Sequence, residues 1–161
     1  MIRRLIILLL IVGCVYRDGT TFDRNGKKMF EGKYKNDKRH GEWIDYYENG
    51  QIKQISHFKN GKFDGKWIKY NENGQITEEV NYKDDVTNGK WILYYENGQI
   101  MSEVDYRNGK YDGKHISYKE NGNILLKWYF KDGDKDGKWT YYNDDGSIDK
   151  IEEYQDGELV E

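Results

Sequence analysis

The stretch GEWIDYYENGQI, residues 41–52, decides the fold, because its pattern returns every 24 residues without insertion or deletion. Two landmarks keep this register along the chain: the glycines Gly26, Gly50, Gly74, Gly98, Gly122 and Gly146, and the row Trp43, Trp67, Trp91, His115 and Trp139. A strict period of this length is typical of repeat proteins, in which each unit buries its apolar side against its neighbours. We therefore expect function to reside on a repeated surface.

The composition favours a thin β-sheet protein. Only 36% of the 161 residues are hydrophobic and the mean hydropathy is -1.07, which leaves little material for a thick core. The apolar supply is rich in Tyr (15) and Trp (5), which pack on a sheet while keeping a polar edge wet. Proline and alanine are absent, so helices have weak support and turns must be made by Gly with Asn or Asp.

One repeat contains two short β-rich runs and two glycine turns. The runs Trp43–Tyr47 and Ile52–Phe58 are too short for helices, and most of the 18 glycines follow Asn or Asp, the strongest local hairpin signal. The sequence predicts an all-β fold: a single-layer antiparallel β-meander of about six 24-residue hairpins. Equivalent side chains should then recur roughly every 9.5 Å, two strand spacings, along the ribbon.

The parity of side chains indicates the length of the first turn. A three-residue loop at 48–50 places Tyr46 and Ile52 on one face, whereas a two-residue turn would separate them. We therefore expect Ile44, Tyr46, Ile52 and Phe58 to share a face. Gly50 would close a type I turn with a bulge in the left-handed conformation.

The N-terminus has the features of an export signal. Arg3 and Arg4 precede an apolar run from Leu5 to Val12, too short to span a bilayer. Residues 11–14, Ile-Val-Gly-Cys, resemble a bacterial lipobox, which implies that Cys14 becomes the lipidated first residue of the mature protein. The prediction is a lipoprotein signal peptide at 1–13, a lipidated tether at 14–20 and repeats at 21–161, in a protein of the cell envelope anchored to a membrane through Cys14. The alternatives are an ordinary cleaved signal or a buried N-terminal strand.

Charge and motif spacing exclude several function classes. The formal net charge is -3 and no basic block occurs, which argues against nucleic acid as a partner. Asp132 to Gly137 resembles half of a calcium loop but lacks its final Glu and flanking helices. The three histidines occupy different repeat positions without a second ligand at metal spacing. We expect no metal, no cofactor and no catalytic residues.

The best candidates for recognition are Trp43, Trp67, Trp91, His115 and Trp139, because Trp is a favoured anchor of protein interfaces. The alternative is that each Trp packs on the adjacent turn as a structural residue. His115 interrupts the row, and drift in one repeat explains it more simply than catalysis.

The repeated motif Gly-Lys-Trp-x-x-Tyr-Tyr-Glu-Asn-Gly-Gln-Ile resembles the bacterial variant of the MORN repeat. The departures are His115 for Trp, Asp85 for Gly and a truncated first copy. The resemblance implies an elongated hairpin sheet for protein or membrane contacts, and related proteins are often labelled YwqK-type antitoxins. We expect a non-catalytic protein-binding scaffold, with toxin neutralisation as the alternative. MORN repeats also precede plant phosphatidylinositol phosphate kinases, but no kinase region remains here once the repeats are counted.

Overall fold

The computed structural model describes residues 10–11 and 14–160, and these form strands and turns without a helix. Strands β2 to β17 make one open antiparallel sheet in which neighbours in sequence are neighbours in space, and β1 pairs with β2 at its first edge. The predicted all-β meander of hairpin repeats is therefore confirmed.

The strand bounds follow the repeat. They are β1 (Leu10–Ile11), β2 (Cys14–Asp18), β3 (Thr21–Phe22), β4 (Lys28–Lys35), β5 (Lys38–Tyr46), β6 (Ile52–Lys59), β7 (Lys62–Phe63), β8 (Gly65–Tyr70), β9 (Ile76–Lys83), β10 (Val86–Tyr94), β11 (Ile100–Arg107), β12 (Lys110–Tyr118), β13 (Ile124–Lys131), β14 (Asp134–Lys135), β15 (Gly137–Tyr142), β16 (Ile148–Gln155) and β17 (Glu158–Leu159).

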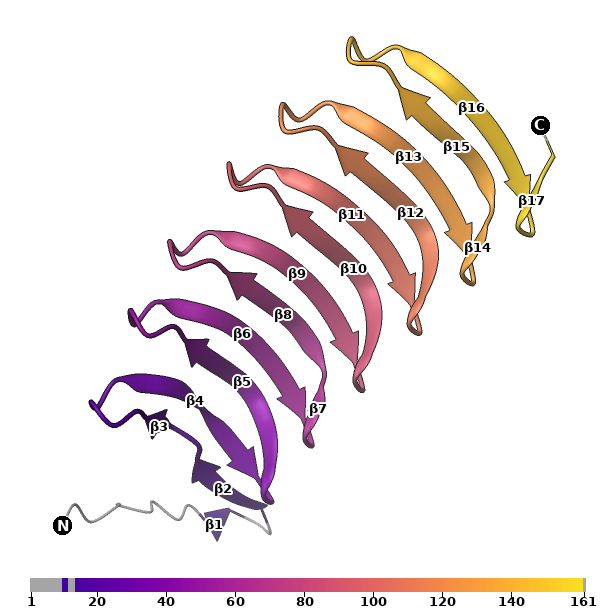
Figure 1. The fold of residues 1–161 in the computed structure, drawn as a ribbon. Helices are drawn as coiled ribbons and strands as arrows, with labels where there is room; N and C mark the ends of the chain where they lie inside the picture. Colours follow the sequence, from indigo (N-terminus) through magenta and orange to yellow (C-terminus); the bar gives the residue numbers. More distant parts are fainter. Residues whose placement is uncertain (1–9, 12–13, 161) are drawn as a thin grey trace.

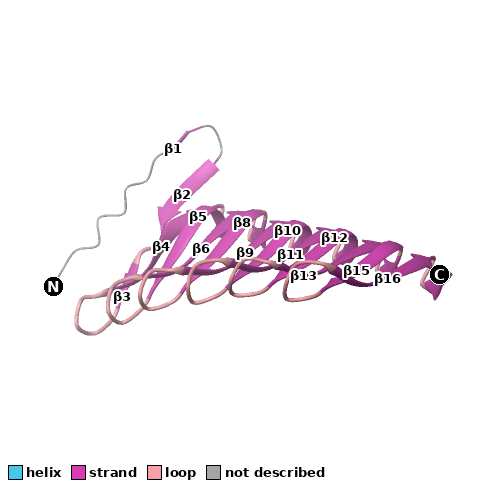
Figure 2. Ribbon diagram, turned by 90° about the horizontal axis from the view of Figure 1, so that it is seen from above, coloured by secondary structure: helices cyan, strands magenta, loops and turns pink. Residues whose placement is uncertain are grey.

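The hairpins follow one another along a bent ribbon (Figure 1). The turns form two rows along its long sides. The "upper turns" are residues 23–26, 47–50, 71–74, 95–98, 119–122 and 143–146, and the "lower turns" are 35–38, 59–62, 83–86, 107–110, 131–134 and 155–158. No second layer covers either face in the described residues (Figure 2), so side chains must bury one another along each face.

The upper turns have the predicted three-residue loop. The Gly50 N–H donates to the Tyr47 carbonyl at 2.9 Å, and the Tyr47 N–H donates to the Gln51 carbonyl at 2.8 Å. Gly50 has a φ of 87°, in the left-handed region that glycine tolerates best. The prediction of a type I turn closed by a glycine bulge is confirmed.

The predicted sharing of one face was wrong for Phe58. Asp45 faces Gln54 but Tyr46 faces Ile52, so β6 carries a further bulge just after the turn. The extra residue reverses the parity of the rest of β6. Phe58 consequently lies on the side of Trp43, with ring centroids 6.3 Å apart.

The lower turns are two-residue type I′ turns. Asn60 and Gly61 both have positive φ, 54° and 89°, which matches the right-handed twist of the flanking strands. In the next repeat Asp85 takes the glycine position with a φ of 72°. Its carboxylate accepts the N–H of Phe63 at 2.7 Å, a contact to the preceding turn that offsets the strain.

Replacing Gly98 with valine should lower the free energy of unfolding by about 1–3 kcal/mol, because a β-branched residue is strained at positive φ. Gly98 has a φ of 83° and open space around the position of a Cβ, so the loss would report backbone strain alone. Equilibrium urea unfolding measures it. Gly98→Asn is the matched control, because asparagine tolerates this conformation; equal losses in both variants would contradict the turn assignment.

The first strands join the segment predicted as a tether to the sheet. β2 pairs with β4 through Tyr16↔Lys35, Arg17↔Tyr34 and Asp18↔Lys33. The guanidinium of Arg17 lies 4.5 Å from the centroid of the Tyr34 ring, a cation–π contact that favours this pairing. Residues 1–9 and 12–13 of the predicted signal peptide lie outside the described residues.

Candidate functional site

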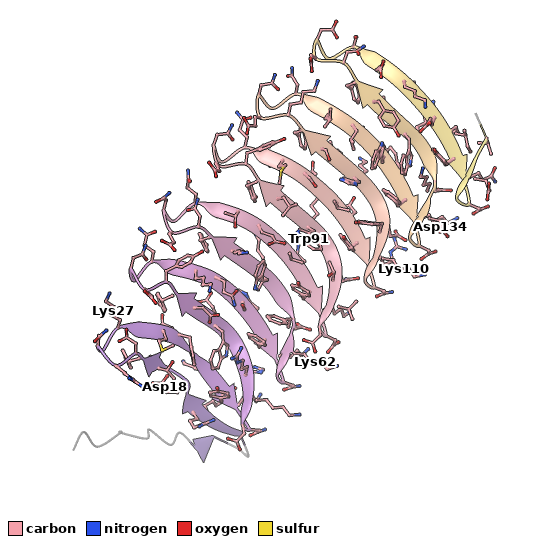
Figure 3. The ribbon with its side chains drawn as sticks, in the orientation of Figure 1. Asp18, Lys27, Lys62, Trp91, Lys110 and Asp134 are labelled. Atoms are coloured by element: carbon pink, nitrogen blue, oxygen red, sulfur yellow. The ribbon has the colours of Figure 1, made fainter. Side chains whose placement is uncertain are left out.

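Large side chains of every repeat gather on the inner side of the bent strands, the "inner face", where Figure 3 labels Trp91. Cross-strand pairing aligns them in rows that run along the ribbon. The rows are Trp43, Trp67, Trp91, His115 and Trp139; Ser56, Val80, Val104 and Trp128; Phe58, Tyr82, Tyr106, Phe130 and Tyr154; and Arg39, Phe63, Thr87, Tyr111 and Lys135.

At the first end of the inner face, Trp43 is a packing residue with 1% of its surface exposed. Its ring lies edge-on to Tyr34 at 4.9 Å, and Arg39 covers it with the guanidinium 4.6 Å from the ring. A Cβ at Gly19 would lie 2.6 Å from the indole, so the ring sits directly on the backbone of the first repeat. Gly19 is the residue that stands where later repeats have Trp.

At the other end, Trp139 is also buried, with 4% exposed. It stacks on Trp128 at 4.3 Å between ring centroids, and its indole N–H donates to the Tyr129 carbonyl at 2.9 Å. The ammonium of Lys135 lies 4.2 Å from its ring. A cation therefore covers the terminal tryptophan at both ends of the row.

The middle of the inner face is more open. Trp67, Trp91 and His115 are half-buried, and Tyr111 is 39% exposed. At the position of Arg39 and Lys135, the repeat of Trp91 has Thr87, which cannot extend over the indole. The four residues Trp67, Trp91, Tyr111 and His115 form what we call the "central strip", resting on the buried Val80 and Val104.

The structure brings the predicted candidates onto one face but gives them two roles. Trp43 and Trp139 are buried and cannot contact a partner without rearrangement, whereas Trp67, Trp91 and His115 belong to the central strip. Cys14 begins β2, and its side chain lies outside what the structure describes.

Sequence reasoning missed Trp128, because it stands outside the tryptophan row. It occupies the position of Val104, one repeat later, and pairs directly with His115. The two rings meet edge-on at 5.4 Å, so the larger indole fills the space that His in place of Trp leaves. The sequence does contain a signal for this pairing, because the smaller residue His115 in place of Trp and the larger residue Trp128 in place of Val occur in the same repeat.

The central strip carries no charge at neutral pH. The neighbouring tyrosines of the inner face are uncharged as well: burial raises the pKa of Tyr82, and burial with a hydrogen bond to Tyr111 raises the pKa of Tyr106. Burial lowers the pKa of His115 below its ordinary 6.5, so the imidazole is neutral. The chemistry of the strip is that of uncharged aromatic rings with polar edges.

Acidification should destabilise the protein through His115. Its pKa is lowered in the folded state, so below the unfolded value of 6.5 the unfolded chain binds more protons and stability falls as the pH falls. In His115→Phe, the free energy of unfolding, measured by urea unfolding at several pH values, should depend less on pH between about pH 7 and 5. His57→Phe, at a more exposed histidine, is the matched control. An unchanged profile in His115→Phe would contradict the burial assigned to this ring.

On the opposite "outer face", charged side chains in the middle of the sheet pair with one another. Lys66 pairs with Glu79 at 2.6 Å and Lys90 pairs with Glu103 at 2.8 Å. The Tyr118 hydroxyl donates to Glu103 at 2.8 Å, and burial together with this bond raises the pKa of Tyr118 to about 12. The middle of the outer face therefore carries ion pairs and hydrogen bonds, in contrast to the uncharged central strip.

In residues 10–11 and 14–160, no group of three His, Cys, Asp or Glu side chains is placed to hold a metal ion. Asp132 and Gly133 form the type I′ turn between β13 and β14, both at positive φ. The described part of the chain contains no helix suited to crossing a membrane.

Comparison with known families gives a match over most of the chain. The model described as "MORN repeat variant" matches six times, at residues 18–36, 39–60, 63–84, 87–108, 111–132 and 135–156. From residue 39 onward, each match starts one 24-residue period after the one before it and contains one upper turn. A search of curated proteins found no match.

Proposed function

The chain belongs to the MORN repeat variant family, and on this basis we propose that it is a non-catalytic scaffold that binds a partner protein on the central strip of its inner face. MORN repeats typically have binding or scaffold roles. The observation that carries the proposal is the contrast between the two faces. The middle of the outer face pairs Lys66 with Glu79 and Lys90 with Glu103, whereas the central strip leaves aromatic rings half-exposed and uncharged.

The chemistry of the strip supports protein binding. Contiguous exposed apolar surface on a soluble protein marks an interaction site more often than it marks chance. Trp and Tyr dominate the energetics of protein interfaces because they bury large areas and keep a polar edge. Val80 and Val104 pair with Trp91 across the neighbouring strands and are buried, so they form the apolar base between the rings of the strip.

The indole of Trp91 supports the same reading. The N–H groups of Trp43 and Trp139 donate to the carbonyls of Lys33 and Tyr129, at 3.2 and 2.9 Å. The N–H of Trp91 has no hydrogen-bond partner in the described residues although little solvent reaches it. This ring is less firmly tied to its own sheet than the two end rings, and a partner carbonyl that it meets after a small rotation would restore the bond.

We place the scaffold in the cell envelope, anchored through a lipid on Cys14. The support is the lipobox resemblance of residues 11–14 and the single cysteine of the chain. Because β2 begins at Cys14, the lipid would hold the first hairpin at the membrane and leave the later repeats projecting from it. Fatty-acid labelling of the parent and of Cys14→Ser tests the anchor. Equal label in both proteins would rule it out.

Photo-crosslinking in the native host tests which face binds. A photoreactive phenylalanine analogue replaces Tyr111 in the central strip in one protein and Tyr129 on the outer face in the other. We expect adducts with a discrete protein from position 111, and mass spectrometry identifies it. A toxin in the adduct would make this scaffold a neutralising protein. Adducts from position 129 alone, or none from either position, would contradict binding on the inner face.

A further inference from the structure

We propose that two copies of this chain associate side by side along their lower turns, in antiparallel orientation about a two-fold axis. The proposal concerns a different surface from the central strip and does not depend on the proposed function. It rests on the sequence of charges along the row of lower turns.

The lower turns form a row along one long side of the ribbon (Figure 1). Lys62, Lys110 and Asp134 belong to three of them and are labelled along this side in Figure 3. With the exception of Lys35, every residue of the six turns is exposed. Each turn follows its predecessor by one 24-residue repeat, so the charges stand at regular steps of roughly 9.5 Å, two strand spacings.

The charge of the turns changes sign along the row. Counting Lys and Arg as +1 and Asp and Glu as -1, the six turns from 35–38 to 155–158 carry +1, +2, -1, +2, -1 and -2. The positive turns owe their charge to Lys35, Lys38, Lys59, Lys62, Arg107 and Lys110, and the negative ones to Asp84, Asp85, Asp132, Asp134, Asp156 and Glu158.

An antiparallel second copy meets this row with the opposite charge at every turn. The first turn faces the sixth (+1 against -2), the second faces the fifth (+2 against -1) and the third faces the fourth (-1 against +2). A parallel copy in the same register would set each turn against its equal and repel it. The orientation is therefore chosen by charge, which is how electrostatic complementarity usually fixes register.

A second copy of the chain also matches the spacing between successive lower turns. The steps of the row are set by the hairpin repeat, and another copy of the same chain presents the same steps over its whole length. A closed two-fold pair uses the row once in each protein and leaves no unmatched turn. The upper turns offer no such match, since from 23–26 to 143–146 they carry 0, -1, -1, -1, 0 and -2.

A hollow between the fifth and sixth turns provides a binding site for the lysines of the second copy. It has a volume of about 140 Å³ and is lined by Lys131, Asp132, Asp134, Lys135, Asp136 and Asp156. Lys135 turns its ammonium toward the rings of Trp139 and Tyr154, 4.2 and 4.3 Å away. The hollow then contains four carboxylates and one remaining lysine, Lys131, so it is negatively charged. In the antiparallel pair it lies opposite the positive first and second turns of the other copy.

Within one chain, Arg107 pairs with Asp112 at 3.0 Å and Asp85 accepts the Phe63 N–H, but the lysines of the row are held only weakly. Lys62 reaches Asp84 of the next turn only at 4.0 Å, and both side chains are more than half exposed. Exposed pairs of this kind contribute little and are screened by salt. The association should likewise be held by several weak contacts, and it should weaken steeply as ionic strength rises.

Analytical ultracentrifugation of the full chain with two complementary variants tests the proposal. Lys59→Glu with Lys62→Glu changes the second turn from +2 to -2. Asp132→Asn with Asp134→Lys changes the fifth turn from -1 to +2, and asparagine keeps the positive φ of residue 132. Each variant sets like charges against each other in its own dimer, whereas a mixture of the two restores opposite charges at both contacts.

We expect the parent to dimerise at low salt and to dissociate at about 0.5 M salt, where the Debye length is only a few ångströms. Each variant alone should dimerise roughly tenfold or more weakly, and the equimolar mixture should regain the affinity of the parent. Glu48→Lys with Glu72→Lys changes the upper turns by four charges, as many as Lys59→Glu with Lys62→Glu changes in the lower turns, and should leave the dimer intact. Circular dichroism verifies that all variants are folded.

Several results would overturn the proposal. These are a parent that stays monomeric at low salt, a dimer that does not respond to salt, a mixture that fails to regain affinity, or a loss in the upper-turn control equal to that of the lower-turn variants.

Discussion

Trp43→Ala is expected to lower the free energy of unfolding by about 3–5 kcal/mol, the range for truncating a buried Trp. The indole is 1% exposed and touches three parts of the fold: Gly19 after β2, Tyr34 in β4 and Phe58 in β6. The backbone beneath the ring cannot collapse into the space left behind, because the sheet is a single layer. Equilibrium urea unfolding measures the loss.

Trp91→Ala is the matched comparison, since the same substitution falls at the same repeat position in the open middle of the inner face. We expect a smaller loss there, because part of the ring already contacts solvent. Losses of equal size in the two variants would contradict the division of the tryptophan row into buried ends and an open centre.

The turn chemistry of this fold could be predicted because it depends on local residues. Gly50 must adopt positive φ in a three-residue loop, and the period of the repeat then propagates that hairpin along the chain. The face of the sheet on which Phe58 lies could not be predicted in the same way. The bulge between the pairs Asp45↔Gln54 and Tyr46↔Ile52 has no glycine or proline to mark it, and one extra residue reverses the parity of the rest of the strand.

The roles within the tryptophan row depended on neighbours that the repeat pattern does not fix. The sequence presents Trp43 and Trp91 as equivalents, yet Arg39 covers the first, whereas Thr87 stands at the corresponding place beside the second. Burial of Trp43 also needs Gly19, in a first repeat too degenerate to align by its motif. Period and motif therefore predicted which residues share a row, while burial was set by the irregular positions around them.

Deletion of residues 87–110, one whole repeat, should leave a folded all-β protein that binds the crosslinked partner more weakly. The deletion joins Val86 to Tyr111. Tyr111 follows the lower turn 107–110 in the same way as Thr87 follows the lower turn 83–86, so the order of strands and turns is kept. Each repeat contacts only its neighbours, so the remaining repeats can still pack. The lost Trp91 should cost about 1–2 kcal/mol of binding free energy if it is an anchor. Circular dichroism and calorimetric titration measure the two effects.

Deletion of residues 111–134, which keeps Trp91 but removes Tyr111 and His115, provides the comparison. Distributed binding predicts a partial loss in both deletions. Complete loss in one and none in the other would mean that a single repeat holds the whole site, contrary to a shared strip.

Affinity for the crosslinked partner, measured together with the melting temperature in Trp91→Ala and Ile92→Ala, tests the central claim most directly. The two residues are adjacent in β10, both half-buried, and point to opposite faces. Binding on the central strip predicts that Trp91→Ala weakens the affinity roughly tenfold, about 1–2 kcal/mol, while Ile92→Ala binds as tightly as the parent. If Trp91→Ala melts earlier but binds like the parent, the strip is structural and the interface lies on another face.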